Sequence, residues 1–85
     1  MEEFTHQEAR GKLGQRVEVL KDGAFLRADI KKGMQGTVSA VATSPYIRSE
    51  TPLEVWVVYV ELDNPLLPRI ENIHKTEYLT ELKER

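Results

Sequence analysis

Alternating apolar and polar positions predict several short β-strands along this chain. Residues 16–20 alternate with a period of two, which places Val17 and Val19 on one face of a strand. Residues 53–62 are apolar on both faces, as expected of a central strand that is covered on both sides. The same reasoning predicts shorter strands over residues 37–43, 69–74 and 79–82.

A short helix is predicted before the first strand. Thr5-His6-Gln7-Glu8 matches the capping box, in which the threonine and the glutamate satisfy each other's backbone N–H groups. The pattern favours a helix over residues 6–12, ended by Gly14. Residues 1–13 are therefore interpreted as a helical extension of a domain that spans residues 14–85.

Two glycines three positions apart predict a sharp bend that leads into a strand. Gly33 and Gly36 flank Met34-Gln35, and glycine enters positive-φ conformations without a Cβ clash. The residues before this bend, 21–33, contain few large apolar groups and predict a long loop pinned by Phe25, Leu26 and Ile30. Residues 44–52 hold two prolines and are predicted to form a second loop.

Together these elements predict a mainly β fold, an SH3-like five-stranded small barrel with a short N-terminal helix. The prediction depends on five short strands, the long first loop, the glycine bend and a helical turn at residues 76–79 before the last strand. The alternative is an α+β domain, which would apply if residues 70–85 are helical. A chain of 85 residues has room for one core only.

Composition indicates a soluble globular protein without disulfides. Hydrophobic residues make up 40% of the chain and charged residues 31%, and there is no cysteine. The longest apolar run, Val55 to Val60, is far too short to cross a bilayer, so no membrane association is expected. The opening Met1-Glu2-Glu3 lacks the basic start of a secretory signal. A cytoplasmic or organelle-interior location is therefore expected.

Charge is unevenly distributed along the chain despite a net charge of −2. Residues 10–32 hold seven bases and three acids, whereas residues 50–85 hold eight acids and four bases. A bipolar surface of this kind favours a charged protein partner.

The bend segment, Lys32-Gly33-Met34-Gln35-Gly36-Thr37-Val38, resembles the K-G-x-x-G-x-V core of KOW modules, which occur in ribosomal proteins and transcription elongation factors. This resemblance implies an RNA- or DNA-binding module. Under that hypothesis the contacts to phosphates would come from four basic residues, Arg16, Arg27, Lys31 and Lys32. Phe25 lies among them and could stack on a base.

The layout of residues 14–82 is similar to that of the electron-transport accessory barrels. This group includes the variable chain of ferredoxin–thioredoxin reductase and a small stromal subunit of photosystem I. Gly14-Gln15-Arg16-Val17-Glu18-Val19 resembles their opening Gly-x-x-Val-x-Val strand with one residue of shift. The Lys-Gly-x-x-Gly bend, the proline-bearing hairpin and the pair Glu81-Leu82 follow in a similar order. The resemblance implies a small barrel that acts as an accessory subunit.

No catalytic set is recognisable in the sequence. His6 and His74 are the only histidines, and neither stands in a known arrangement with a serine or an aspartate. Asp22, Asp29 and Asp63 flank turns, where an aspartate normally bonds its own backbone. We therefore expect no enzyme activity, no metal site and no cofactor.

The leading functional hypothesis is a non-catalytic barrel that docks on another protein as an accessory or assembly subunit. Tyr46 and Arg48, on the proline-bearing hairpin, are the predicted contacts to that partner, because both residue types are enriched at binding hot spots. Trp56 is expected in the core instead. The alternative is the KOW-like RNA- or DNA-binding module.

Overall fold

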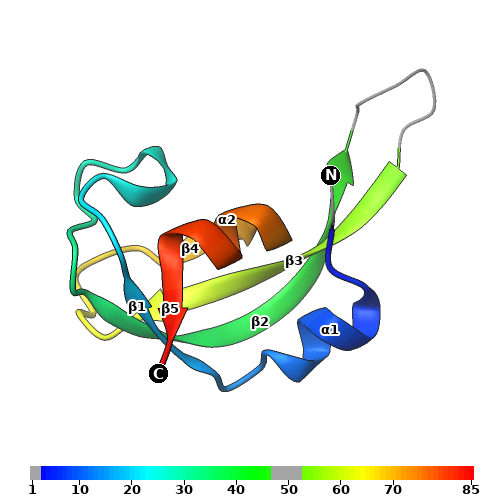
Figure 1. Cartoon of the computed structure of the whole chain (residues 1–85), viewed down its shortest axis with the longest axis horizontal. Coiled ribbons are helices and arrows are strands. Elements are labelled where there is room, and N and C mark those ends of the chain that lie inside the picture. Colours follow the sequence, from blue (N-terminus) through cyan, green and yellow to red (C-terminus); the bar gives the residue numbers. More distant parts are fainter. Residues whose placement is uncertain (1–2, 47–52) are drawn as a thin grey trace.

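A computed structural model describes residues 3–46 and 53–85 and shows a single antiparallel sheet (Figure 1). The strands follow the order β4-β3-β2-β1-β5 across the sheet. Their bounds are β1 (Arg16–Val19), β2 (Gln35–Tyr46), β3 (Leu53–Leu62), β4 (Ile70–Ile73) and β5 (Leu82–Glu84). Among the described residues no backbone pairing joins β4 to β5, so the sheet is open. The mainly β class and the number of strands are confirmed, but the last strand was expected over residues 79–82 and is instead Leu82–Glu84.

The described residues also form two short α-helices and one turn of 3₁₀ helix: α1 (His6–Gly11), α2 (Lys75–Glu81) and η1 (Ala24–Leu26). The predicted capping box of α1 is confirmed, because Thr5 Oγ1 accepts from the Glu8 backbone at 3.1 Å and Glu8 Oε1 accepts from the Thr5 backbone at 2.9 Å. Residues 70–85 alternate strand, helix and strand, so they are not helical throughout.

The N-terminal segment runs across the sheet from β3 to β2. Phe4 forms an isolated antiparallel bridge with Trp56 on β3, and Gly14 donates its N–H to the Val38 carbonyl of β2 at 2.9 Å. α1 lies between these two points and contacts β3 (Figure 1). Phe4 and Ala9 are consequently buried in the main core.

The core lies between the sheet and the C-terminal helix. Val17 and Val19 from β1 and Val58 and Val60 from β3 are almost fully buried there, together with Tyr78 from α2. Phe4 packs edge-on against the Tyr78 ring, with centroids 5.6 Å apart. Apolar side chains from both ends of the chain therefore meet in one core.

The β2–β3 hairpin is longer than the sequence pattern predicts. β2 runs through Ser44 and Pro45 to Tyr46, which pairs with Leu53, whereas a loop was expected to begin at residue 44. The expected start of the loop is therefore wrong. The extension is possible because pairing to β3 supplies a backbone register that local composition does not reveal, and Figure 1 shows the hairpin projecting beyond the rest of the sheet.

The two glycines of the predicted bend have different roles. Gly33 has a φ of 92°, in the left-handed region that favours glycine. Gly36 lies in β2 without a positive φ, so the expected strained backbone at this position is wrong. A Cβ at Gly36 would lie 2.6 Å from the Glu61 carbonyl oxygen on β3. Gly36 is thus constrained by the close approach of two strands.

Candidate docking surface

The four basic residues predicted to contact nucleic acid divide into two pairs. Arg16 forms a bidentate ion pair with Asp63, with both N–O distances 2.7 Å, and also donates to Thr37 Oγ1 at 2.9 Å. This contact holds the pKa of the Asp63 carboxyl below its usual value, mainly through the hydrogen bond from Arg16. Arg16 is therefore committed within the fold.

Arg27 is similarly occupied. Its guanidinium pairs with Asp29 at 2.7 and 3.0 Å and donates to the Arg69 carbonyl at 3.0 Å. Lys31 and Lys32 are exposed, and no ion pair joins either side chain to another described residue. Within the described part of the chain, only two of the four candidate phosphate contacts thus carry a positive charge that is not paired with a carboxylate.

The loop over residues 21–33 has an unusual backbone at its tip. Phe25 and Leu26 are consecutive non-glycine residues with positive φ, 58° and 59°. Left-handed backbone at an L-residue with a large side chain costs about 1–2 kcal/mol per residue. The turn therefore persists only because contacts elsewhere in the molecule hold it.

Those contacts come from Glu81, at the end of α2. Its Oε2 accepts the Phe25 backbone N–H at 3.1 Å, and its Oε1 pairs with Lys21 Nζ at 2.9 Å. The Glu81 side chain is only 14% exposed. At the neck of the loop, Gly23 donates to the Ile30 carbonyl at 2.8 Å. A largely buried carboxylate thus fixes the strained tip to the body of the protein.

The consequence of this turn is a fully exposed apolar side chain. Phe25 packs against the core and Ile30 is buried, as predicted, but Leu26 is exposed at 101% of its reference area. The expectation that Leu26 pins the loop is wrong, because its left-handed backbone directs the side chain away from the core. Leu26 is therefore an apolar side chain that is free to contact a partner protein.

A second exposed leucine lies on the neighbouring loop between β3 and β4. Leu66 is 88% exposed. The hydrogen bond from Arg27 to the Arg69 carbonyl joins this loop to the 21–33 loop. A cavity of about 240 Å³ lies at the same end, lined by Met34 and Leu67 among others. The carboxylate in the lining of this cavity, Asp63, is already paired with Arg16, so the cavity offers no free charged group. We therefore define the docking surface by the two exposed leucines, Leu26 and Leu66.

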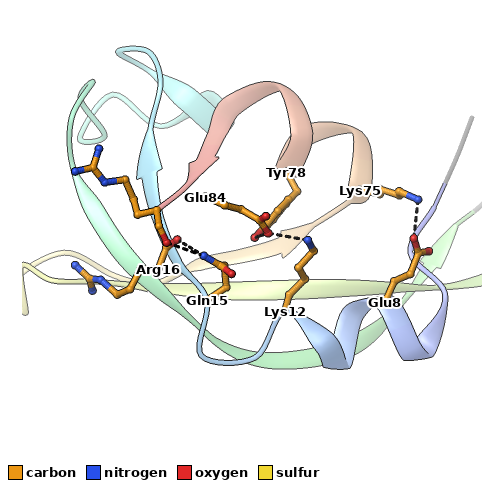
Figure 2. Close-up of polar contacts among 8 residues, drawn as sticks. Glu8, Lys12, Gln15, Arg16, Lys75, Tyr78 and Glu84 are labelled. Carbon is orange, nitrogen blue, oxygen red and sulfur yellow. Dashed lines mark hydrogen bonds and ion pairs between the residues drawn. The ribbon is translucent and has the colours of Figure 1, made fainter.

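Polar contacts bind the N-terminal segment to the C-terminal elements (Figure 2). Glu84 lies between Lys12 Nζ, at 2.6 Å, and the Tyr78 hydroxyl, which donates at 2.7 Å. Lys75 Nζ bonds Glu8 at 2.9 Å on the neighbouring turn. The pKa of Glu84 is lowered, first by the Lys12 hydrogen bond and then by Tyr78, while burial raises the pKa of Tyr78. Each of the two glutamates is thus paired with a lysine, and the contacts join the two ends of the chain.

The histidines have structural contacts. His6 stacks on the Trp56 ring, with centroids 4.2 Å apart, and His74 caps α2 and contacts Glu3 Oε2 at 2.9 Å. In the part of the chain that the structure describes, no three histidine, aspartate or glutamate side chains gather as a metal site would require. No helix among the same residues is long and apolar enough to cross a membrane.

The predicted partner contacts, Tyr46 and Arg48, stand in the sequence at and just after the end of β2. Tyr46 ends β2, and its backbone pairs with Leu53. Arg48 lies outside the described residues. Their role remains a prediction from the sequence. Sequence reasoning missed Leu26 as a contact, because a left-handed backbone at leucine has no local signature.

Comparison of the chain with protein-family models, with curated proteins and with solved structures gave no match.

Proposed function

We propose that this chain is a non-catalytic SH3-like small barrel that docks on another protein as an accessory or assembly subunit. The barrel assignment is supported by the strand order, in which β1 lies between β2 and β5, and by the helix directly before β5. The long β2 pairs with β1 at one end and with β3 along its length, as a strand shared by both halves of a small barrel does.

The observation that carries the docking proposal is the strained tip at Phe25 and Leu26. A fold that holds two consecutive left-handed residues, and thereby exposes a leucine completely, sacrifices stability for presentation. Glu81 keeps the tip rigid, so little conformational entropy is lost when Leu26 enters a pocket on the partner. The partner is therefore a protein with an apolar pocket.

The KOW-like alternative has weaker support. Arg16 and Arg27 donate to internal carboxylates, and a phosphate would have to displace those ion pairs. The net charge of −2 also lacks the basic excess that draws a protein to nucleic acid. We therefore place protein docking first.

The test is affinity capture from an extract of the native host with three tagged variants and the wild-type chain. Leu26→Asn removes the apolar side chain but keeps a residue that tolerates left-handed backbone, so the fold is preserved. Leu79→Asn is the matched control, because Leu79 is likewise an exposed leucine, 61% exposed on α2, and is not one of the two residues that define the docking surface. The third variant combines Tyr46→Ala with Arg48→Ala, the contacts predicted from the sequence.

We expect a discrete protein that the wild type and Leu79→Asn retain and that Leu26→Asn loses. Its purified form should bind Leu26→Asn at least about tenfold more weakly, as truncation of an interface anchor does. Loss of the same protein only with the Tyr46 and Arg48 variant would move the docking surface to the hairpin. Capture of no protein that distinguishes any variant from the wild type would refute the proposal.

A further inference from the structure

β2 has one edge that faces β3 and one that faces β1, and the edge that faces β1, here called the outer edge, is open along more than half of its length. β1 pairs with β2 only at residues 35–37, and Gly14 and Gln15 bond the Val38 backbone next to them. From Ser39 onward, no described residue pairs with this edge, while the inner edge pairs with β3 as far as Tyr46. The hairpin therefore presents a row of backbone N–H and C=O groups to its surroundings (Figure 1).

This strand lacks the charge that normally protects an open edge. Residues 35–46 contain no charged side chain, although charged residues make up 31% of the whole chain. Natural edge strands commonly carry lysine or other charges that prevent pairing with another chain. Ser39 and Thr43 are exposed, and Ala40 and Ala42 are small. A second strand could approach this edge without meeting a bulky or charged group.

Two features limit the open edge to a short segment. The register with β3 shifts between Val38 and Ala40, which places a bulge at Ser39. Pro45 stands at the other end of the segment and has no N–H to donate. A proline within a sheet is tolerated where its nitrogen faces away from the partner strand, so it ends the outward row of donors. The edge available for pairing is therefore Ala40–Ser44.

We propose that this edge, Ala40–Ser44, pairs in antiparallel orientation with the same edge of a second copy of the chain. The two sheets would become one continuous sheet across a two-fold axis, an isologous arrangement that closes at a dimer. Self-pairing suits an uncharged strand, because it brings no like charges together at the axis. A different protein would find no charge here by which to recognise the edge.

The bulge at Ser39 and the proline at position 45 also favour pairing with a second copy of the chain. They confine pairing to one short register, which fits a closed dimer rather than an extending stack of strands. An interface of this length is small, so the dimer should be weak and depend on concentration. The edge lies at the opposite end of the molecule from the 21–33 loop (Figure 1), so the proposal does not depend on docking through Leu26.

The experiment measures self-association of the full chain by sedimentation velocity from about 10 µM to about 1 mM, where weak interfaces associate. Thr43→Lys places a charge on the exposed edge. Thr80→Lys is the matched control, because Thr80 is also an exposed threonine and lies on α2. Hydrogen exchange of the amides in residues 40–44 of the wild type is followed at both extremes of concentration.

We expect the wild type and Thr80→Lys to change from monomer to dimer within this range. Thr43→Lys should weaken the dimer at least about tenfold, since an edge lysine opposes strand pairing. In the wild type, amide exchange in residues 40–44 should slow as concentration rises, a readout that does not depend on any variant folding. A wild type that stays monomeric, exchange that does not respond to concentration, or equal association of Thr43→Lys would each overturn the proposal.

Discussion

At the scale of single residues, Gly33 and Gly36 are constrained in two different ways. A glycine pair before an apolar run indicates a constraint at both positions, and Gly33 has the left-handed backbone that this reasoning predicts. The constraint at Gly36 is space, because the Glu61 carbonyl and a Val60 methyl lie where its Cβ would be. Such an approach of two strands is a tertiary fact, so no local pattern could distinguish the two glycines.

Gly36→Ala should destabilise the protein by about 1–3 kcal/mol, the usual cost of overpacking a site without room. The nearest atom is backbone, so it cannot swing aside as a flexible side chain would. Gly11→Ala is the control, because no atom lies within 4 Å of its added Cβ and alanine favours a helix. Urea denaturation of both variants measures the difference. Equal free energies of unfolding for Gly36→Ala and the wild type would contradict the close approach.

Glu84→Gln should make stability less dependent on acid pH. Folding lowers the pKa of Glu84 below its usual 4.5, chiefly because Lys12 donates to it and then because Tyr78 does. A lowered folded pKa gives stability that is present above the unfolded pKa and lost as pH falls through the folded pKa. The stability gap between wild type and Glu84→Gln should therefore be largest near neutral pH.

That gap should narrow as the pH falls below 4.5, the usual pKa of Glu84. Thermal melts of both proteins between about pH 3 and pH 7 follow the linkage. Glu8, Asp29 and Asp63, whose pKa values are also lowered, contribute equally to both proteins and cancel in the difference. A gap independent of pH would show that Glu84 acts by packing alone.

At the scale of elements, the sequence predicts those helices and turns whose stabilising contacts are close together in the chain. The capping box of α1 joins Thr5 and Glu8 across three residues, and the sequence predicts it correctly. The tip of the 21–33 loop depends on Glu81, which is 56 positions from Phe25. Apolarity alone suggested that Leu26 faces the core, because no pattern within the loop reveals this distant carboxylate.

Glu81→Gln should loosen the strained tip without unfolding the protein. It removes the ion pair with Lys21 and weakens the acceptor of the Phe25 N–H, so a left-handed turn loses its main support. We expect hydrogen exchange at the Phe25 amide to accelerate at least about tenfold. Glu71→Gln is the control, because Glu71 pairs with Arg69 at an exposed site. Equal exchange rates in the two variants would show that the tip is held by other contacts.

At the scale of the whole molecule, alternation and turn signals predict the number and approximate place of the strands. They do not predict the path of the N-terminal segment, which was interpreted as an extension over residues 1–13. Phe4 bridges to Trp56 and packs on Tyr78, and Lys12 reaches Glu84 near the other end of the chain. These contacts join residues up to 74 positions apart, which periodicity does not encode. The segment contributes to the same core as the strands.

Phe4→Ala should therefore destabilise the entire fold by about 3–5 kcal/mol, the usual cost of truncating a buried phenylalanine. Leu79→Ala, at a leucine that is 61% exposed, should change stability by no more than about 0.5 kcal/mol. The decisive readout is hydrogen exchange at the Val17 and Val19 amides of β1, because β1 forms no pairing with Phe4. Faster exchange there in Phe4→Ala would mean that the segment and the sheet unfold as one unit. Exchange that accelerates only in residues 3–12 would mean instead that the segment is an appendage on an independently stable sheet.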